Sequence, residues 1–142
     1  MRRRGLHGYA YAIFAGGTSG VNIEGVATGN KVNRITVRSA SYGIYGGGGN
    51  VSISYCDVEV TNTTKNADGD YDFCSNSGIN AASGSTGVTM IGRADGSNKV
   101  TVRSVDNAIY GAGQPVTIKY YDVEVFSNGS GYEPSVPENH RA

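Results

Sequence analysis

The chain contains a long internal repeat, and this feature restricts its possible folds more than any other. Segment 35–60 reads ITVRSASYGIYGGGGNVSISYCDVEV, and 65 residues later segment 100–125 reads VTVRSVDNAIYGAGQPVTIKYYDVEV. The two copies align along their length, with Arg38 matched to Arg103 and Tyr45 matched to Tyr110. Such repetition is typical of solenoids, in which each unit buries its apolar face against the next unit.

A shorter period lies within this repeat. A small residue followed by Ile and then by an aromatic residue or Asn occurs at 12–14, 43–45, 78–80 and 108–110. Each occurrence is followed by a V-x-I type segment, at 21–23, 51–53, 88–90 and 116–118. A V-x-V type segment comes next, at 35–37, 58–60, 100–102 and 123–125. The pattern predicts four units of three short strands, twelve strands in all.

Short strands joined by corners rich in Gly and Asn are typical of a coil of parallel strands, because these residues accept the positive φ values of sharp corners. We therefore expect an all-β fold, a right-handed single-stranded parallel β-helix with about four three-stranded rungs at 11–127. Residues 1–10 would form an irregular N-terminal segment and residues 128–142 a C-terminal tail. Alternation along the strands predicts one inner column of Ile13, Ile44, Ile79 and Ile109.

The segment GIYGGGGNVSISYCDVEV at 43–60, with its second copy from residue 108, resembles the parallel β-helix repeat of the pectate-lyase-like superfamily. In its Gly-rich character it is similar to clostridial surface proteins that bind pectic polysaccharide with calcium. The superfamily contains polysaccharide lyases, glycoside hydrolases, epimerases, phage tailspikes and non-catalytic surface proteins. The resemblance therefore implies a fold and leaves the function open among these classes.

Charge and hydropathy argue against two classes of partner. Twelve Lys and Arg balance twelve Asp and Glu, so no net positive field favours nucleic acid, and we expect no nucleic-acid partner. No apolar run approaches the length of a membrane span, so we expect no membrane insertion. Gly8 and Gly16 interrupt the apolar N-terminal stretch, which does not read as a signal peptide. The repeat architecture favours a piece of a larger exported protein, located outside the cell or at its surface.

The third strands carry charged residues on their outer face. The expected columns are Arg34, Asp57, Lys99 and Asp122, then Thr36, Glu59, Thr101 and Glu124, then Arg38, Thr61, Arg103 and Phe126. Asp57 and Glu59 would lie about 6.6 Å apart, within the range of an inverting glycosidase pair, and are weak catalytic candidates. A ladder of opposite charges is the favoured interpretation, because a carboxylate beside a guanidinium stays ionised and is a poor general acid. We therefore assign no catalytic residue.

The first strands predict a second outer column, formed by Phe14, Tyr45, Asn80 and Tyr110. A row of aromatic rings on a rigid face can stack against sugar rings, which makes these four residues candidate ligand-binding residues. Equivalent rings in a solenoid also stack on one another without any ligand. Both interpretations fit the sequence.

The loop between Val60 and Ile79 interrupts the regular spacing and contains Asn66, Asp68, Asp70 and Asp72. Oxygen ligands at every second position around a Gly are suited to calcium, so these four residues are candidate metal ligands. The loop departs from an EF-hand, because Ser77 stands where the twelfth-position Glu would be. A solvated acidic loop without a metal is the alternative.

Cys56 and Cys74 are the two cysteines of the chain and belong to different corners of the expected coil. A disulfide between them requires the loop to fold back. The two histidines, His7 and His140, lie in the terminal segments, so neither a zinc site nor a Ser/His/Asp triad is indicated.

Two classes of function follow. The first is a non-catalytic carbohydrate-binding or surface module with a polysaccharide ligand, and the second is a fragment of a polysaccharide lyase or glycoside hydrolase acting on acidic polysaccharide. A single acidic loop and a short groove favour the first class over the second. A purely structural spacer is a third alternative. The strand edges at the rung of Ile13 also predict self-association through that end, as a head-to-head dimer or larger aggregate.

Overall fold

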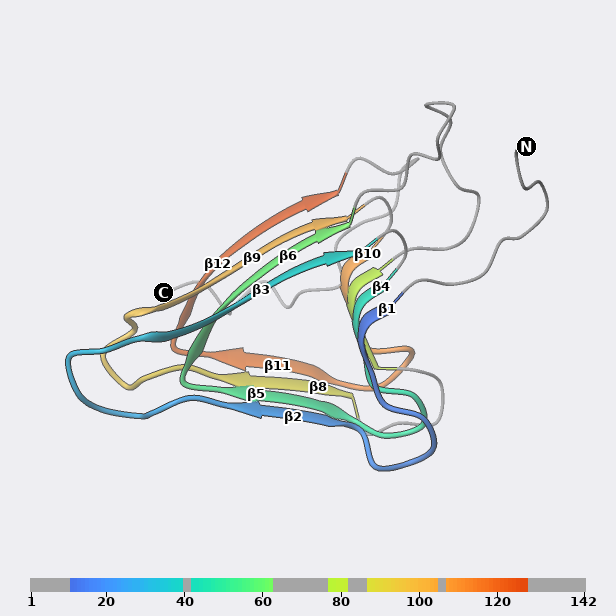
Figure 1. Ribbon diagram of the computed structural model, residues 1–142, viewed down its shortest axis with the longest axis horizontal. Coiled ribbons are helices and arrows are strands. Elements are labelled where there is room, and N and C mark those ends of the chain that lie inside the picture. Colours follow the sequence, from blue (N-terminus) through green and yellow to red (C-terminus); the bar gives the residue numbers. More distant parts are fainter. Residues whose placement is uncertain (1–10, 40–41, 63–76, 82–86, 105–106, 128–142) are drawn as a thin grey trace.

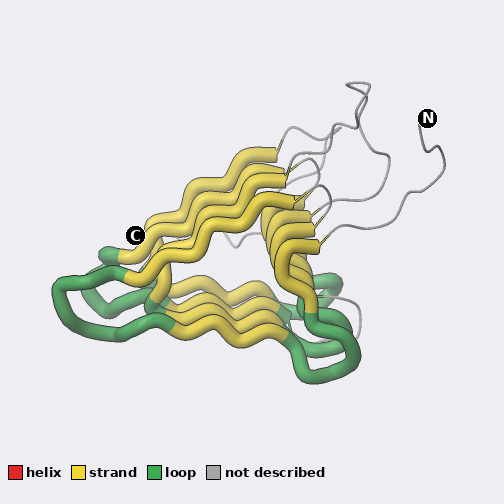
Figure 2. The backbone as a smooth tube through the Cα atoms, in the orientation of Figure 1, coloured by secondary structure: helices red, strands yellow, loops and turns green. Residues whose placement is uncertain are grey.

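The computed structural model describes residues 11–39, 42–62, 77–81, 87–104 and 107–127. Within these ranges the chain forms twelve β-strands and no helix (Figure 2). The strands are β1 (Tyr11–Phe14), β2 (Val21–Glu24), β3 (Asn33–Ser39), β4 (Tyr42–Tyr45), β5 (Val51–Ser54), β6 (Cys56–Asn62), β7 (Ser77–Asn80), β8 (Val88–Ile91), β9 (Asn98–Ser104), β10 (Asn107–Tyr110), β11 (Val116–Lys119) and β12 (Tyr121–Ser127).

The strands form three sheets, ordered β1-β4-β7-β10, β2-β5-β8-β11 and β3-β6-β9-β12. All strand pairs in the register are parallel. Figure 1 shows the three sheets surrounding a common interior. The chain is therefore a parallel β-helix, and the predicted all-β solenoid of four rungs is confirmed. We number the rungs along the chain: rung 1 is β1–β3, rung 2 is β4–β6, rung 3 is β7–β9 and rung 4 is β10–β12.

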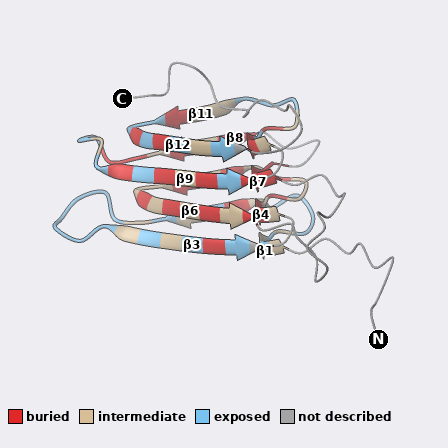
Figure 3. Ribbon diagram, turned by 90° about the horizontal axis from the view of Figure 1, so that it is seen from above, coloured by how far each residue is buried: buried red, intermediate tan, exposed pale blue. Residues whose placement is uncertain are grey.

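The register agrees with the columns expected from the sequence. Ile13 pairs with Ile44, Ile44 with Ile79, and Ile79 with Ile109. On the third sheet, Thr36, Glu59, Thr101 and Glu124 follow one another, as do Arg38, Thr61, Arg103 and Phe126. Side chains alternate between interior and surface along β6 and β9, which Figure 3 shows as alternating burial along each strand. Any slip by one residue would turn these apolar side chains outward, so burial itself determines the register.

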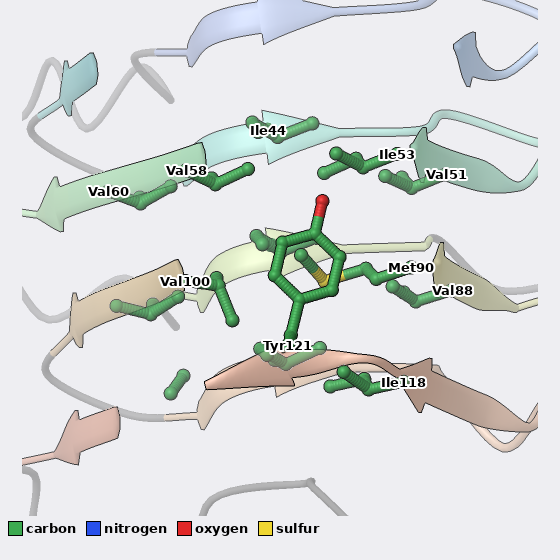
Figure 4. Close-up of a cluster of buried hydrophobic side chains, with 14 of the residues drawn as sticks. Ile44, Val51, Ile53, Val58, Val60, Val88, Met90, Val100, Ile118 and Tyr121 are labelled. Atoms are coloured by element: carbon green, nitrogen blue, oxygen red, sulfur yellow. The ribbon is translucent and has the colours of Figure 1, made fainter. Parts of the chain in front are cut away.

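The interior is filled by stacked aliphatic side chains. Ile44, Ile79 and Ile109 are fully buried, and Val and Ile side chains from the other two sheets pack against them. Figure 4 shows the Tyr121 ring extending from rung 4 across rung 3 toward the side chains of rung 2. Its hydroxyl donates a hydrogen bond of 2.7 Å to the Cys56 carbonyl oxygen. This contact satisfies the one polar group of the ring inside an apolar interior.

Two glycines are required where the first sheet approaches the third. A Cβ built on Gly78 would overlap Val102 Cγ1 and lie 2.7 Å from the Ala108 carbonyl oxygen. A Cβ on Gly43 would overlap Val60 Cγ1 and lie 2.7 Å from the Gly78 carbonyl oxygen. The small residue in the repeated motif therefore reflects close packing in the two inner rungs.

The corners between the second and third sheets alternate in length. In rungs 2 and 4 one residue makes the corner, Tyr55 with φ 56° and Tyr120 with φ 61°. In rungs 1 and 3 the corner is a longer loop, at 25–32 and 92–97. The expectation of Gly or Asn at the sharp corners holds for several glycines but not for these two tyrosines.

Arg93 connects the two long corners. Its side chain is buried, and its guanidinium donates three hydrogen bonds to backbone carbonyl oxygens of the rung 1 loop. The acceptors are Val26 at 3.0 Å, Gly29 at 2.9 Å and Lys31 at 2.6 Å. The buried charge is thus held by backbone dipoles, which gives the long loop a defined position.

Candidate functional site

The outer face of the first sheet carries the aromatic column that the sequence predicts. Phe14 pairs with Tyr45, Tyr45 with Asn80, and Asn80 with Tyr110. Phe14 is 53% exposed and Tyr110 is 37% exposed, whereas Asn80 is buried. The structure therefore places all four candidate ligand-binding residues in one column, with the aromatic row interrupted at rung 3.

The rings of rungs 1 and 2 contact each other directly. Phe14 stacks on Tyr45 with ring centroids 5.5 Å apart and planes at 24°. Tyr11 stacks on Tyr42 at 5.3 Å and 13°. Tyr11 also lies 4.5 Å from Phe14, and Tyr42 lies 5.0 Å from Tyr45, in each case between ring centroids. We call Phe14, Tyr45 and Tyr110, together with Tyr11 and Tyr42, the aromatic surface.

The local backbone explains why rings three residues apart share a face. In β4 and β10 the two central residues are both buried, and the residues at the two ends are more exposed. These two strands therefore depart from strict alternation, and in β4 the first and last rings, Tyr42 and Tyr45, lie 5.0 Å apart between centroids. Sequence reasoning missed Tyr11 and Tyr42 because it assumed period-two alternation. The signal that could have found them is the pattern Tyr-x-Ile-aromatic, which occurs at 11–14 and again at 42–45.

The carboxylates considered as catalytic candidates have partners on neighbouring rungs. Asp57 Oδ1 accepts hydrogen bonds from Asn98 Nδ2 at 3.0 Å and from the Lys99 backbone nitrogen at 2.9 Å. Asp57 Oδ2 also lies 4.0 Å from Arg34 Nη2. Asp57 therefore connects three consecutive rungs.

Glu59 lies two residues further along β6, on the same face as Asp57. Its Oε2 lies 3.8 Å from Arg103 Nη1, and both side chains are about half exposed. The same guanidinium is 5.0 Å from the centre of the Phe126 ring on rung 4. Exposed pairs of this kind contribute on the order of 0.2–1 kcal/mol each. These contacts are those of a stabilising ladder between rungs.

The candidate calcium ligands Asn66, Asp68, Asp70 and Asp72 lie outside the described residues, as does Cys74. Cys56 is a free, buried thiol at the start of β6. Burial, followed by the nearby Asp57 carboxylate, raises the pKa of the Cys56 thiol. Among the described residues no group of three or more His, Cys, Asp or Glu side chains is placed to hold a metal ion.

The described part of the chain contains no helix that is long and apolar enough to cross a membrane. Comparison with known proteins finds no matching family model, no matching curated protein and no matching solved structure. The parallel β-helix and the aromatic surface are therefore the two observations from which a function can be argued.

Proposed function

We propose that this chain is a non-catalytic carbohydrate-binding module, displayed outside the cell or at its surface as part of a larger exported protein. The observation that carries the proposal is the aromatic surface, on which the exposed rings of Phe14 and Tyr110 and the partly exposed rings of Tyr11, Tyr42 and Tyr45 lie along one face of a sheet. Aromatic rings bury the apolar faces of sugars, and an exposed apolar patch on a rigid surface is a common mark of a binding site.

The arrangement of the rings favours an extended ligand. Phe14 on rung 1 and Tyr110 on rung 4 lie three rung spacings apart, about 14 Å along the coil axis. A polysaccharide chain running parallel to that axis would meet Phe14, Tyr45 and Tyr110 in turn. The row is interrupted at the buried Asn80, so the ligand would contact rings on rungs 1, 2 and 4.

The resemblance of 43–60 to the pectate-lyase-like repeat, and to clostridial surface proteins, supports an acidic, pectin-like polysaccharide as the ligand class. It also supports calcium as the cofactor of polysaccharide binding, with Asn66, Asp68, Asp70 and Asp72 as its proposed ligands. The contacts of Asp57 and Glu59 with Asn98, Lys99, Arg34 and Arg103 argue against an enzyme that would use these carboxylates as acid and base.

A glycan array followed by titration with the oligosaccharides that bind tests the proposal. We expect Phe14→Ala and Tyr110→Ala each to weaken binding by about tenfold or more, because each removes a ring from the row. Phe126→Ala is the matched control, since Phe126 is 46% exposed but belongs to the outer face of the third sheet. Folding of each variant is checked by circular dichroism.

Three results would overturn the proposal: binding to no glycan, equal binding by all variants, or a loss of binding in Phe126→Ala alone. An assay for unsaturated uronide or reducing-end release on the same polysaccharides addresses the alternative function. Product release that is lost in Asp57→Asn and Glu59→Gln would establish the lyase or hydrolase class instead.

A further inference from the structure

The first and last rungs have edges without strand partners among the residues that the structure describes. Each sheet ends at β1, β2 or β3 on one side and at β10, β11 or β12 on the other. Three inward side chains of rung 1, Ile13, Ile23 and Ile35, are only partly buried, whereas Ile44 and Ile53 of rung 2 are fully buried. On rung 4, Val116 and Val125 are only partly buried, whereas Ile109 and Val123 are buried.

The internal repeat relates these two edges to an interface inside the chain. Rung 4 repeats the sequence of rung 2, and β9 of rung 3 repeats β3 of rung 1. Inside the chain, one edge of rung 2 is covered by rung 3. The outer edge of rung 4 is therefore equivalent to the edge of rung 2 that faces rung 3. In the same way, the outer edge of rung 1 is equivalent to the edge of rung 3 that faces rung 2.

We propose that copies of this chain stack head to tail, with rung 1 of one copy continuing the β-helix on rung 4 of the next. The occupant of each open edge is thus a second copy of this chain, and the junction reproduces the interface between rungs 2 and 3. Both edges of a β-helix carry backbone donors and acceptors in the spacing that a further parallel strand requires.

The inward side chains at such a junction are complementary in kind. Extending the internal register places Val123 and Val125 of one copy beside Ile35 and Val37 of the next, as Val58 and Val60 lie beside Val100 and Val102 within the chain. In the second sheet, Val116 and Ile118 would meet Val21 and Ile23, as Val51 and Ile53 meet Val88 and Met90. These four inward positions of the junction are therefore filled by aliphatic side chains on both sides.

The charges at the junction are also complementary. Lys119 of one copy would pair with Glu24 of the next, at the position where Ser54 pairs with Ile91 inside the chain. Asp122 would pair with Arg34, as Asp57 lies beside Lys99. Glu24, Lys119 and Asp122 are all exposed, and within the described residues none of them forms an ion pair or side-chain hydrogen bond.

The internal interface contains a hydrogen bond between rungs, and the residues equivalent to its donor and acceptor lie at the two open edges. Inside the chain, Asn98 Oδ1 accepts from the Arg93 backbone nitrogen at 2.7 Å, while Asn98 Nδ2 donates to Asp57 at 3.0 Å. At the rung 1 edge, Asn33 Oδ1 accepts in the same way from the Val26 backbone nitrogen at 2.9 Å. No acceptor for Asn33 Nδ2 occurs among the described residues. At the junction this amide would donate to Asp122 of the neighbouring copy.

The two surfaces of this junction are different, so the contact is heterologous. A heterologous contact that does not close into a ring produces an open-ended assembly. The proposal therefore differs from the head-to-head dimer expected from the sequence, which would join two copies of the Ile13 edge. It also predicts that Tyr110 of one copy meets Phe14 of the next, so that the aromatic surface continues along the assembly.

A charge-reversal pair tests the proposal directly by sedimentation velocity and light scattering across a range of concentrations. The wild-type chain should increase in average mass with concentration, without a limit at the dimer. Glu24→Lys alone places lysines on both sides of the junction, and Lys119→Glu alone places glutamates on both sides, so each should associate about tenfold more weakly. Mixed in equal amounts, the two variants present opposite charges at every mixed junction, and association should return.

The control is Asp95→Lys, which changes the net charge by the same amount as Glu24→Lys but lies on the exposed corner loop of rung 3. It should associate like the wild-type chain. A wild-type chain that stays monomeric at ~100 μM, well into the range where exposed edges associate, would overturn the proposal. So would a mass that stops at the dimer, single variants that associate like wild type, or a mixture that does not recover. None of these readouts involves a glycan, so the assembly and the proposed function can fail independently.

Discussion

At the scale of single residues, Tyr121 shows how a polar group is accommodated inside a very thin core. Its hydroxyl reaches across rung 3 to the Cys56 carbonyl oxygen, and its side chain is fully buried. Desolvation is the main cause that raises the pKa of Tyr121 above its ordinary value of 10.0. The folded chain therefore retains the Tyr121 proton at a pH where the unfolded chain has lost it.

Tyr121→Phe should lower the free energy of unfolding by about 1–2 kcal/mol near neutral pH, because the Cys56 carbonyl loses a buried hydrogen bond. The stabilisation from the raised pKa is complete below pH 10 and decreases as pH rises above 10, since the unfolded chain then ionises and the folded chain does not. The difference between wild type and variant should therefore shrink above pH 10. Denaturant titrations at neutral and alkaline pH measure it, and a constant difference would contradict the assigned burial.

Tyr120 makes a one-residue corner with φ 61°, a conformation that β-branched residues adopt with difficulty. Tyr120→Val should destabilise the fold by about 1–2 kcal/mol, whereas Tyr120→Asn should be neutral or slightly stabilising. Because Tyr120 is 52% exposed, loss of packing contributes little to the comparison. Thermal melts of the two variants measure the order, and equal melting temperatures would show that the corner relaxes to a negative φ.

At the scale of elements, the strands and their register could be predicted because the same three-strand pattern occurs four times in the sequence. The residues that the sequence did not reveal either have no equivalent in the other units or contact segments far away in the sequence. Arg93 contacts carbonyl groups more than sixty residues earlier in the chain, and nothing near it in sequence marks that role. Tyr42 was missed because burial along β4 does not alternate strictly. Tyr11 was missed because its ring contacts that of Phe14 although burial along β1 alternates.

The Arg93 contact should determine the order of the 25–32 loop. Arg93→Met removes three hydrogen bonds to this loop and should lower stability by about 1–3 kcal/mol. Hydrogen exchange of the amides at 25–32 should be faster in the variant than in the wild-type chain. Exchange at β5 and β8 should be the same in both, because the substitution leaves these strands in place. Arg93→Lys retains the charge but lacks the planar guanidinium, so we expect the 25–32 amides to exchange at a rate between those of wild type and Arg93→Met. Unchanged exchange in Arg93→Met would show that the loop holds its position without this side chain.

The loop with Asn66, Asp68, Asp70 and Asp72 gives a prediction from sequence alone. If these oxygens bind calcium, millimolar calcium should raise the melting temperature, and magnesium should raise it less, because calcium tolerates an irregular set of oxygen ligands. Asp68→Asn with Asp70→Asn should abolish the shift. Identical melting with calcium and with chelator would favour a solvated acidic loop.

At the scale of the whole molecule, stability is distributed by rung rather than around one centre. Each rung contacts its neighbours, so the two inner rungs are covered on both sides and the outer rungs on one. In the Ile column, Ile13 of rung 1 is only partly buried, whereas Ile44, Ile79 and also Ile109 of rung 4 are fully buried. Equivalent positions in the repeat therefore differ in energy according to their place in the stack.

Two matched substitutions measure this difference. Ile79→Ala removes a side chain enclosed by rungs 2 and 4 and should lower the free energy of unfolding by about 2–5 kcal/mol. Ile13→Ala removes the equivalent side chain from the partly covered rung 1 and should cost about 1 kcal/mol in dilute solution. Denaturant titrations of both variants against wild type give the two values.

Assembly should change the cost of one of these two substitutions and not of the other. If rung 4 of another copy covers rung 1, Ile13 becomes enclosed like Ile79, and its substitution becomes more costly as the protein concentration rises. Ile13→Ala should therefore weaken head-to-tail stacking, whereas Ile79→Ala should lower stability by the same amount at every concentration. An Ile13→Ala cost equal to that of Ile79→Ala in dilute, monomeric protein would mean that rung 1 is already covered within the single chain, and the open edge would have to be abandoned.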